Sequence, residues 1–120
     1  MTADADPEFL EFVYLRSYER STRAFSGPGQ REALEDALES APVENPDVGV
    51  VIPDAGGLRK VRVALMGRGK SGGARVIYFH RRAKRRVYVL LAYSKNAKSD
   101  LTPAERQIMQ QLMRSLEGES

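Results

Sequence analysis

The sequence predicts a single α+β domain with secondary structure in the order β-α-α-β-β-β-α. Three observations lead to this prediction. Residues 58–93 contain three segments rich in β-branched and apolar residues, separated by short polar turns, which is typical of a small sheet. Residues 30–40 and 102–117 carry apolar residues at helical spacing. With 120 residues, no internal repeat and no long linker, the chain has the length of one domain, residues 1–120.

The first quarter of the chain contains one ambiguous segment and one short helix. We expect residues 1–8 to be disordered. The apolar run at residues 12–15 fits either a short strand or the start of a helix, because four residues do not define a period. Residues 18–25 predict a short helix, which ends at the breaker Ser26-Gly27-Pro28-Gly29.

A second helix is expected at residues 30–40, with Ala33, Leu34, Ala37 and Leu38 forming its apolar stripe. Pro42 and Pro46 are expected to end it, because proline lacks the N–H that a helix needs. An irregular segment is then expected as far as Gly57.

Three strands follow, at residues 58–65, 74–81 and 86–93. In the first strand, valine and leucine alternate with positions that include Lys60 and Arg62, which predicts one buried face and one basic face. The third strand is apolar on both faces, as expected of a central strand. Because the connections are short, we expect the three strands to be antiparallel neighbours.

The last helix is marked by Thr102-Pro103-Ala104-Glu105, which combines an N-cap threonine, a proline at the first helical position and a glutamate three residues after the cap. The helix is expected to extend to about Glu117, with Ile108, Leu112 and Leu116 on its buried face.

Composition excludes several classes of site. The chain has no cysteine, so disulfides, zinc thiolate sites and thiol catalysis are excluded, and its single histidine, His80, cannot form a histidine metal cluster. We therefore expect no metal and no cofactor. No apolar run approaches the roughly 18 residues of a membrane span, and the acidic N-terminus lacks the basic region of a signal peptide. These features predict a cytoplasmic protein that does not associate with a membrane.

Charge is distributed unevenly along the chain. Residues 55–99 contain thirteen lysines and arginines and no carboxylate, whereas residues 1–54 contain twelve acids and four arginines. Like charges that are crowded on one surface destabilise the folded state, and a polyanionic partner offsets that repulsion. The basic segment therefore indicates nucleic acid as the partner; an acidic protein is the alternative.

The stretch Gly69-Lys70-Ser71 resembles the end of a phosphate-binding P-loop. The required glycine five residues earlier is Ala64, and the following segment predicts a strand instead of the helix that a P-loop needs. The sequence therefore argues against a nucleotide-hydrolysing site and favours a basic loop between two strands.

The basic segment has side chains suited to metal-independent cleavage of RNA. In that reaction the ribose 2′-hydroxyl attacks the neighbouring phosphate, so one group must remove its proton, another must stabilise the pentacovalent dianion and a third must protonate the leaving 5′-oxygen. Arginine grips phosphoryl oxygens with its planar fork, lysine can exchange protons when other cations crowd it, and tyrosine can stack on a base.

Each candidate also has a structural interpretation. Arg75 can pair across the sheet, and Lys95 and Asn96 can be an ordinary polar strand exit. Tyr78 and Tyr93 fit the edge of a core as well as a base-stacking role. His80 can be an acid–base group or an incidental strand residue. Arg81, Arg82, Lys84, Arg85 and Arg86 surround a turn and are either solvated or a second RNA contact.

Three ordered motifs resemble a known family. They are Gly56-Gly57-Leu58-Arg59-Lys60-Val61-Arg62, then Gly67-Arg68-Gly69-Lys70-Ser71-Gly72-Gly73-Ala74-Arg75-Val76-Ile77-Tyr78, and then Leu91-Ala92-Tyr93-Ser94-Lys95-Asn96 followed by Asp100-Leu101-Thr102. Over residues 50–115 the chain resembles the HigB-like branch of the RelE/ParE toxin superfamily, from type II toxin–antitoxin modules.

The resemblance implies a RelE-like fold, in which two N-terminal helices pack on a small curved antiparallel sheet with a C-terminal helix beside it. It also implies metal-independent cleavage of mRNA in the decoding site of the 30S ribosomal subunit, and neutralisation by a HigA-like antitoxin with a helix-turn-helix domain. By position, the resemblance assigns catalysis to Lys60, Arg62, Arg75, Lys95 and Tyr93, and RNA binding to Arg59, Arg68, Lys70, Tyr78 and Asn96.

One departure concerns the end of the chain. Several relatives use a C-terminal tyrosine or histidine, whereas no aromatic residue or histidine follows Tyr93 here, so the general acid is unassigned. Three hypotheses stay open: a ribosome-dependent mRNA endonuclease, a non-catalytic gyrase inhibitor of ParE type, and a plain RNA-binding module.

Overall fold

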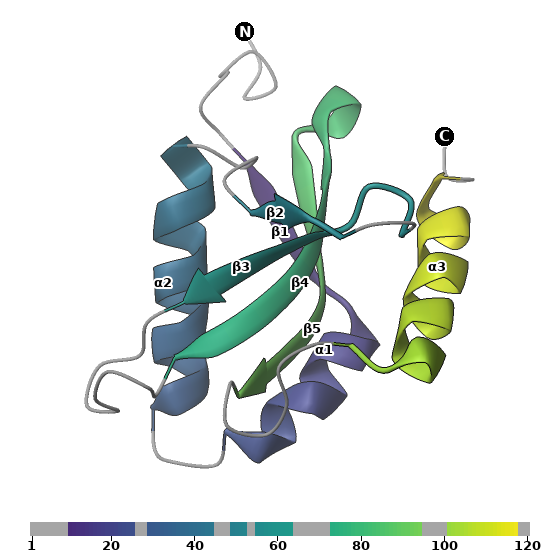
Figure 1. Ribbon diagram of the computed structural model, residues 1–120. Coiled ribbons are helices and arrows are strands. Elements are labelled where there is room, and N and C mark those ends of the chain that lie inside the picture. The colour runs from purple at the N-terminus through teal and green to yellow at the C-terminus, as the bar shows by residue number, and fades with distance from the viewer. Residues whose placement is uncertain are drawn as a thin grey trace, which may run out of the picture.

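A five-stranded sheet forms the centre of the molecule, with helices on both of its faces (Figure 1). The computed structural model describes residues 10–25, 29–44, 49–52, 55–63, 73–94 and 101–117. The strands lie in the order β1-β5-β4-β3-β2. Their bounds are β1 Glu11–Tyr14, β2 Val50–Val51, β3 Arg59–Val63, β4 Ala74–Arg81 and β5 Arg86–Ser94. The helices are α1 Arg16–Ser21, α2 Gln30–Glu44 and α3 Pro103–Glu117, with short 3-10 turns η2 Thr22–Ala24 and η3 Arg82–Lys84.

The predicted fold class is confirmed, and the predicted element order holds with one added strand, β2. The ambiguous segment near residue 12 is strand β1, and it pairs with β5 in parallel, so the sheet is mixed and not purely antiparallel. Two helices and three strands separate β1 from β5, so the antiparallel rule for short connections does not apply to this pair. The two-residue strand β2 falls in the segment expected to be irregular, and it pairs antiparallel with β3.

The helices differ in extent from the prediction. The first is shorter, because α1 ends at Ser21 and a 3-10 turn continues to Ala24. The prediction that Pro42 ends the second helix is wrong, since α2 continues to Glu44. Pro42 lies in the last turn of α2, where its missing N–H removes one helical hydrogen bond without ending the helix. None of the helices in the described ranges is both long enough and apolar enough to cross a bilayer.

Helices α1 and α2 cover one face of the sheet. Their buried residues Tyr18, Leu34 and Leu38 pack against Val76, Tyr78, Val87 and Val89 of strands β4 and β5. A polar network is built into this face: the Tyr18 hydroxyl donates to Glu35 Oε2 at 2.9 Å, and Arg31 Nε donates to the same oxygen at 2.9 Å. We call this side of the sheet the α2 face.

Helix α3 covers the other side of the sheet, which we call the α3 face. Met109, Met113 and Leu116 pack there against Ile77, Tyr88 and Leu90. The predicted stripe is therefore one residue out of place, because Ile108 is 52% exposed and Leu112 only partly buried, while Leu116 is buried as expected. Both stripes satisfy helical spacing, and packing on the sheet selects the one with the two methionines.

Both ends of α3 are secured. Thr102 Oγ1 accepts a bond from the Glu105 N–H at 3.1 Å and Glu105 Oε1 accepts one from the Thr102 N–H at 3.0 Å, which confirms the predicted capping box. At the other end Arg81 Nη1 donates to the Leu116 carbonyl oxygen at 2.6 Å. This bond satisfies one of the carbonyls that every helix leaves unpaired, and it ties α3 to the end of β4.

Candidate nucleic-acid interface

Three of the predicted site residues form one row across the sheet. In the strand register Arg62 of β3 lies opposite Arg75 of β4, and Arg75 lies opposite Tyr93 of β5. Paired residues of antiparallel strands point to the same face, and neighbouring strands are about 4.8 Å apart. Tyr93 belongs to the buried cluster under α3, so the whole row lies on the α3 face.

Lys60 joins this row from the same strand as Arg62. It is two residues away, so it points to the same face at a distance of roughly 7 Å along β3. Its partner in the register is Ile77, which is also part of the cluster on the α3 face. Lys60, Arg62 and Arg75 therefore share one face of the sheet, while Lys95, expected on the same surface, lies outside the described residues.

Arg75 is the least satisfied cation of the row. Its side chain is half-buried, and its Nη1 atom is buried without a hydrogen-bond partner among the described residues. A buried guanidinium N–H without an acceptor costs roughly 1–3 kcal/mol or more. Such an atom is suited to a negatively charged ligand, because an oxygen of the ligand would supply the missing acceptor.

Gly73 brings the two basic strands together at the start of β4. A Cβ atom at this position would lie 3.0 Å from the Val63 carbonyl oxygen and 3.8 Å from Arg62 Nε. The glycine therefore permits close approach of β3, and it leaves the Arg62 side chain room to lie over the strand beside Arg75.

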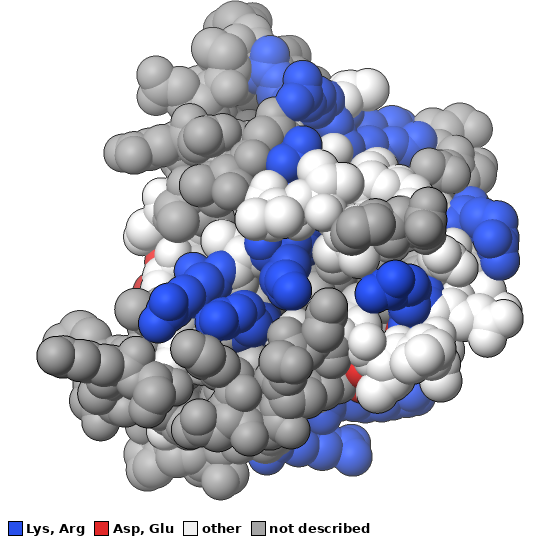
Figure 2. Space-filling view, viewed as in Figure 1, with Lys and Arg blue, Asp and Glu red and all other residues white. Residues whose placement is uncertain are grey.

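Many of the described side chains on the surface that Figure 2 shows are basic. Lysine and arginine side chains spread over the middle of the view, where β3 and β4 lie, while acidic side chains show only as narrow patches. Among the described residues, no three His, Cys, Asp or Glu side chains lie close enough together to hold a metal ion. The chemistry available here is that of arginine, lysine and tyrosine.

Three other candidates lie on the α2 face and do not join the row. Tyr78 is fully buried, and its hydroxyl accepts a bond from the Gly49 N–H at 3.0 Å, so the prediction that it contacts RNA is wrong. Arg59 precedes Lys60 and points the opposite way, and its Nη1 donates to the Gly49 carbonyl oxygen at 2.8 Å. We therefore assign Arg59 a structural role. His80 follows the alternation of Tyr78, so it too lies on the far side of β4 from Arg75.

Tyr93 lies on the predicted surface but is only 5% exposed. This burial favours the core interpretation of Tyr93 over base stacking, and its assignment to catalysis stays a prediction. Tyr93 lies opposite Arg75 in the strand register and packs in the cluster under α3. This position suits a residue that holds the arginine in place.

The remaining predicted residues lie outside the described ranges. These are Arg68 and Lys70, in the loop that resembles a P-loop, and Lys95 and Asn96, which follow the end of β5. The expected disorder of residues 1–8 also falls outside the described part of the chain.

Arg106 of α3 is a candidate that the sequence reasoning missed. It lies one turn before the buried Met109, so it occupies the inward-facing stripe of the helix. Its side chain is half-buried, and its Nε atom is buried without a hydrogen-bond partner in the described part of the structure. The sequence signal for Arg106 is an arginine at a position that continues the apolar stripe of α3.

The comparison with known families decides the family. A model described as the RelE toxin of the RelE/RelB toxin–antitoxin system matches residues 20–120. This chain belongs to the RelE toxin family. The expectation of a toxin that cleaves mRNA is thereby confirmed, and the RelE/RelB description implies an antitoxin as its partner. Membership of the HigB-like branch stays a prediction.

Two solved structures of RelE from Escherichia coli are similar to this chain. The first, a double arginine-to-alanine mutant in the free state, has 18% identity and a TM-score of 0.50, and the match covers 74% of this chain and 86% of that one. The second, the isolated toxin, has 17% identity and a TM-score of 0.48, with 87% and 99% covered. The first match supports the same fold; at these identities neither assigns residue roles.

Proposed function

We propose that this RelE-family chain is a ribosome-dependent endoribonuclease that cleaves mRNA without a metal ion, by attack of the ribose 2′-hydroxyl on the adjacent phosphate. The observation that carries the proposal is the row formed by Arg62 and Arg75, in which a buried Arg75 N–H lacks an acceptor among the described residues. A phosphate placed over this row would provide that acceptor.

The two arginines suit the charge that develops during the reaction. As the 2′-oxygen bonds to phosphorus, a pentacovalent dianion forms, and its equatorial oxygens accept hydrogen bonds. Guanidinium groups from adjacent strands present several donors in fixed directions, and donors aimed at a transition-state oxyanion are worth roughly 10²–10³-fold in rate each. Arg75 is held by its burial, while the exposed Arg62 can adjust to the substrate.

Among the described polar residues of this surface, Lys60 is the proposed partner for removal of the 2′-hydroxyl proton. Arginine does not lose its proton in proteins, and Tyr93 is buried, whereas Lys60 is partly exposed beside Arg62. In this scheme Lys60 contacts the 2′-hydroxyl as that group loses its proton and bonds to phosphorus, the phosphorus–5′-oxygen bond breaks, and an acid protonates the departing oxygen. Lys95 and Asn96, two and three residues beyond Tyr93, are the proposed contacts to the leaving side of the phosphate.

The ribosome is the proposed site of action because its decoding site presents mRNA as a single strand. The proposed antitoxin is HigA-like, with a helix-turn-helix domain that represses the operon. Co-expression tests this partner: the product of an adjacent helix-turn-helix gene should restore growth and co-purify with the chain, and a neighbouring gene of another kind would argue against it.

The central test is Arg75→Ala. Induced expression of the wild-type chain should arrest growth, and the substitution should reduce in vitro cleavage of ribosome-bound mRNA by about 10²-fold or more. The matched control is Arg20→Ala, which removes an exposed arginine of α1 and should stay toxic. A stable Arg75→Ala protein that arrests growth as strongly as the control would refute the assignment.

The products test the chemistry. Attack by the 2′-hydroxyl leaves a 2′,3′-cyclic phosphate on one fragment and a 5′-hydroxyl on the other, and a 2′-deoxy nucleotide at the cleaved position should block the reaction. Primer extension on cellular mRNA should locate cuts inside reading frames. Intact messages together with DNA damage would favour gyrase inhibition, and RNA binding without toxicity would favour a plain binding module.

A further inference from the structure

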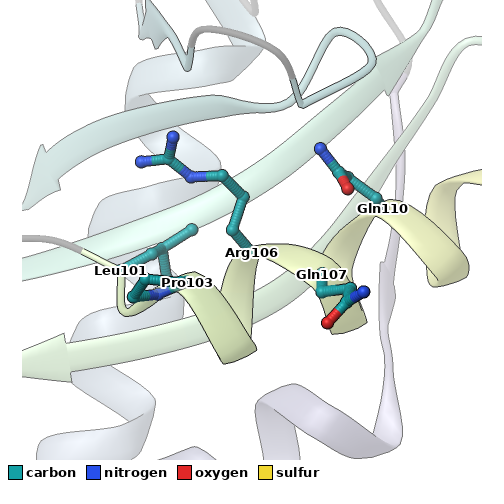
Figure 3. A pocket seen from close by; sticks show the side chains of 5 residues that line it. All are labelled: Leu101, Pro103, Arg106, Gln107 and Gln110. Atoms are coloured by element: carbon teal, nitrogen blue, oxygen red, sulfur yellow. The ribbon is translucent and has the colours of Figure 1, made fainter.

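A hollow of about 350 Å³ lies beside the first two turns of α3. It is lined by Leu101, Pro103, Arg106, Gln107 and Gln110. Figure 3 shows that Arg106 leaves the helix on the side of the strands, that Gln110 lies on the same side and that Gln107 points the other way. The volume falls within the roughly 300–1,000 Å³ typical of small-molecule sites.

Arg106 stands at a position that packing would give to an apolar residue. Residues 106, 109, 113 and 116 follow one helical stripe, and the last three are buried methionine or leucine. Burying the Nε atom of Arg106 without a partner lowers stability, because the N–H loses water and gains no acceptor. The folded protein alone does not explain an arginine here; a ligand that accepts a hydrogen bond in the hollow does.

The lining favours a nucleobase over a phosphate group. A phosphate site is typically built from several cations or backbone N–H groups, whereas the described residues that line this hollow include one cation, neutral amides and two apolar side chains. A base has flat apolar faces and a polar edge. Leu101 and Pro103 offer apolar contact, while guanidinium and amide groups offer hydrogen bonds to the edge.

No other stacking group is available at this end of the chain. No aromatic residue follows Tyr93, and Tyr93 itself is buried under α3. A base next to the Arg62–Arg75 row can therefore gain apolar contact from the Leu101–Pro103 segment, and it can stack on the plane of the Arg106 guanidinium as bases do on arginine elsewhere. Leu101 belongs to the same buried cluster as Tyr93, which links the hollow to the row.

We infer that this hollow is a subsite for one unpaired RNA base beside the cleaved phosphate, and that Arg106 reads the edge of that base. The inference rests on the proposed RNA substrate but not on cleavage. Arginine offers donors only, so the subsite favours bases with two adjacent acceptors, guanine and cytosine, over adenine and uracil. Arg106 is in this sense a specificity-determining residue.

Binding tests the subsite directly. The purified full chain is titrated with fluorescent 2′-O-methyl pentanucleotides, which cannot be cleaved and which differ only in a central G, C, A or U. The expected result is at least about fivefold tighter binding of the G or C probe than of the A probe. Arg106→Gln, which offers both a donor and an acceptor, should shift the preference towards A. Arg106→Met should abolish any preference.

The matched control is Arg114→Met, an exposed arginine two turns later on the same helix, which should weaken all four probes equally and only slightly. Equal affinity of the wild type for the four probes, or an unchanged ranking in Arg106→Gln, would overturn the inference. A residue that merely supports the helix is not expected to change the ranking of the four probes. Thermal unfolding of each variant tests whether the fold is retained.

Cleavage mapping on ribosomes separates this inference from the proposed function. If the wild type and Arg106→Gln cut the same codons at the same relative rates, the subsite is refuted and the endonuclease stands. If binding depends on Arg106 as described but no message is cut, the endonuclease is refuted and the base subsite stands.

Discussion

The two faces of the sheet differ in how completely their buried polar groups are paired. On the α2 face, the hydroxyls of Tyr14 and Tyr18 donate to Glu39 and Glu35, and Arg31 bonds to the same Glu35 oxygen as Tyr18. On the α3 face, Arg75 and Arg106 each bury a guanidinium N–H for which the described residues supply no acceptor.

The buried polar groups of the α2 face are therefore satisfied within the protein, whereas those of the α3 face are suited to hydrogen bonds with a ligand. Paired polar groups inside a core stabilise one arrangement of the helices, whereas unpaired donors lower stability until an acceptor arrives. We expect substitutions on the α2 face to change mainly the free energy of unfolding, and substitutions on the α3 face to change mainly RNA binding and cleavage.

The largest expected effect on stability is that of Tyr18→Ala. The ring is fully buried between the helices and the sheet, so its removal leaves a cavity and should lower the free energy of unfolding by about 3–5 kcal/mol. Urea denaturation followed by circular dichroism measures this. A loss below about 1 kcal/mol would show that α1 does not pack on the sheet as described.

Glu35→Ala should come next, at about 1–3 kcal/mol, because it leaves the Tyr18 hydroxyl and Arg31 without their shared acceptor. The matched control is Glu32→Ala, an exposed position on the same helix, which should change stability by less than about 0.5 kcal/mol. Equal losses in the two variants would mean that the Tyr18–Glu35 contact contributes nothing particular.

Alkaline pH should weaken the α2 face. Burial, followed by the hydrogen bond to a carboxylate, raises the pKa of both Tyr14 and Tyr18 above the ordinary value of 10.0. Because the folded state favours the neutral forms, the contribution of each tyrosine to the free energy of unfolding is fully present below about pH 10. It is lost as pH rises above about 10, by up to about 1.4 kcal/mol per pH unit for each tyrosine. Unfolding measured from pH 9 to 11 should therefore show a shallower decline for Tyr18→Phe than for the wild type.

The smallest effect on stability, and one of opposite sign, is expected on the α3 face. Arg75→Met replaces a half-buried, incompletely bonded cation with an apolar side chain of similar length, so the free energy of unfolding should stay unchanged or rise by up to about 1 kcal/mol. Arg62→Met, at an exposed position, is the comparison and should be neutral. A loss above about 1 kcal/mol in Arg75→Met would show that the arginine serves the fold.

Much of the α3 face could be predicted from sequence because strand alternation is a local property. Residues 74–81 were expected to form a strand and form β4 with the same bounds, and Lys60 and Arg62 share a face as their spacing requires. The same alternation puts Arg59 and Tyr78 on the opposite side from Lys60 and Arg75, away from the proposed RNA-binding surface.

Other features depend on packing between distant segments. Strand β5 is apolar on both faces, so nothing in its composition shows that β1 will pair with it in parallel. In α3, Ile108 and Met109 both belong to plausible apolar stripes, and only contact with the sheet selects Met109. Arg106 was missed for the same reason, since its inward position depends on that choice.

The pairing of β1 with β5 also affects synthesis of the chain. Glu11 and Arg86, 75 residues apart, form an ion pair across these strands at 2.9 Å. Strand β1 therefore cannot join the sheet before β5 has been synthesised. Contacts of such long sequence separation form late in folding. A ribosome that stops before Arg86 therefore releases a fragment that lacks the pairing partner of β1, although the β3–β4 pair that carries Arg62 and Arg75 is already present in it.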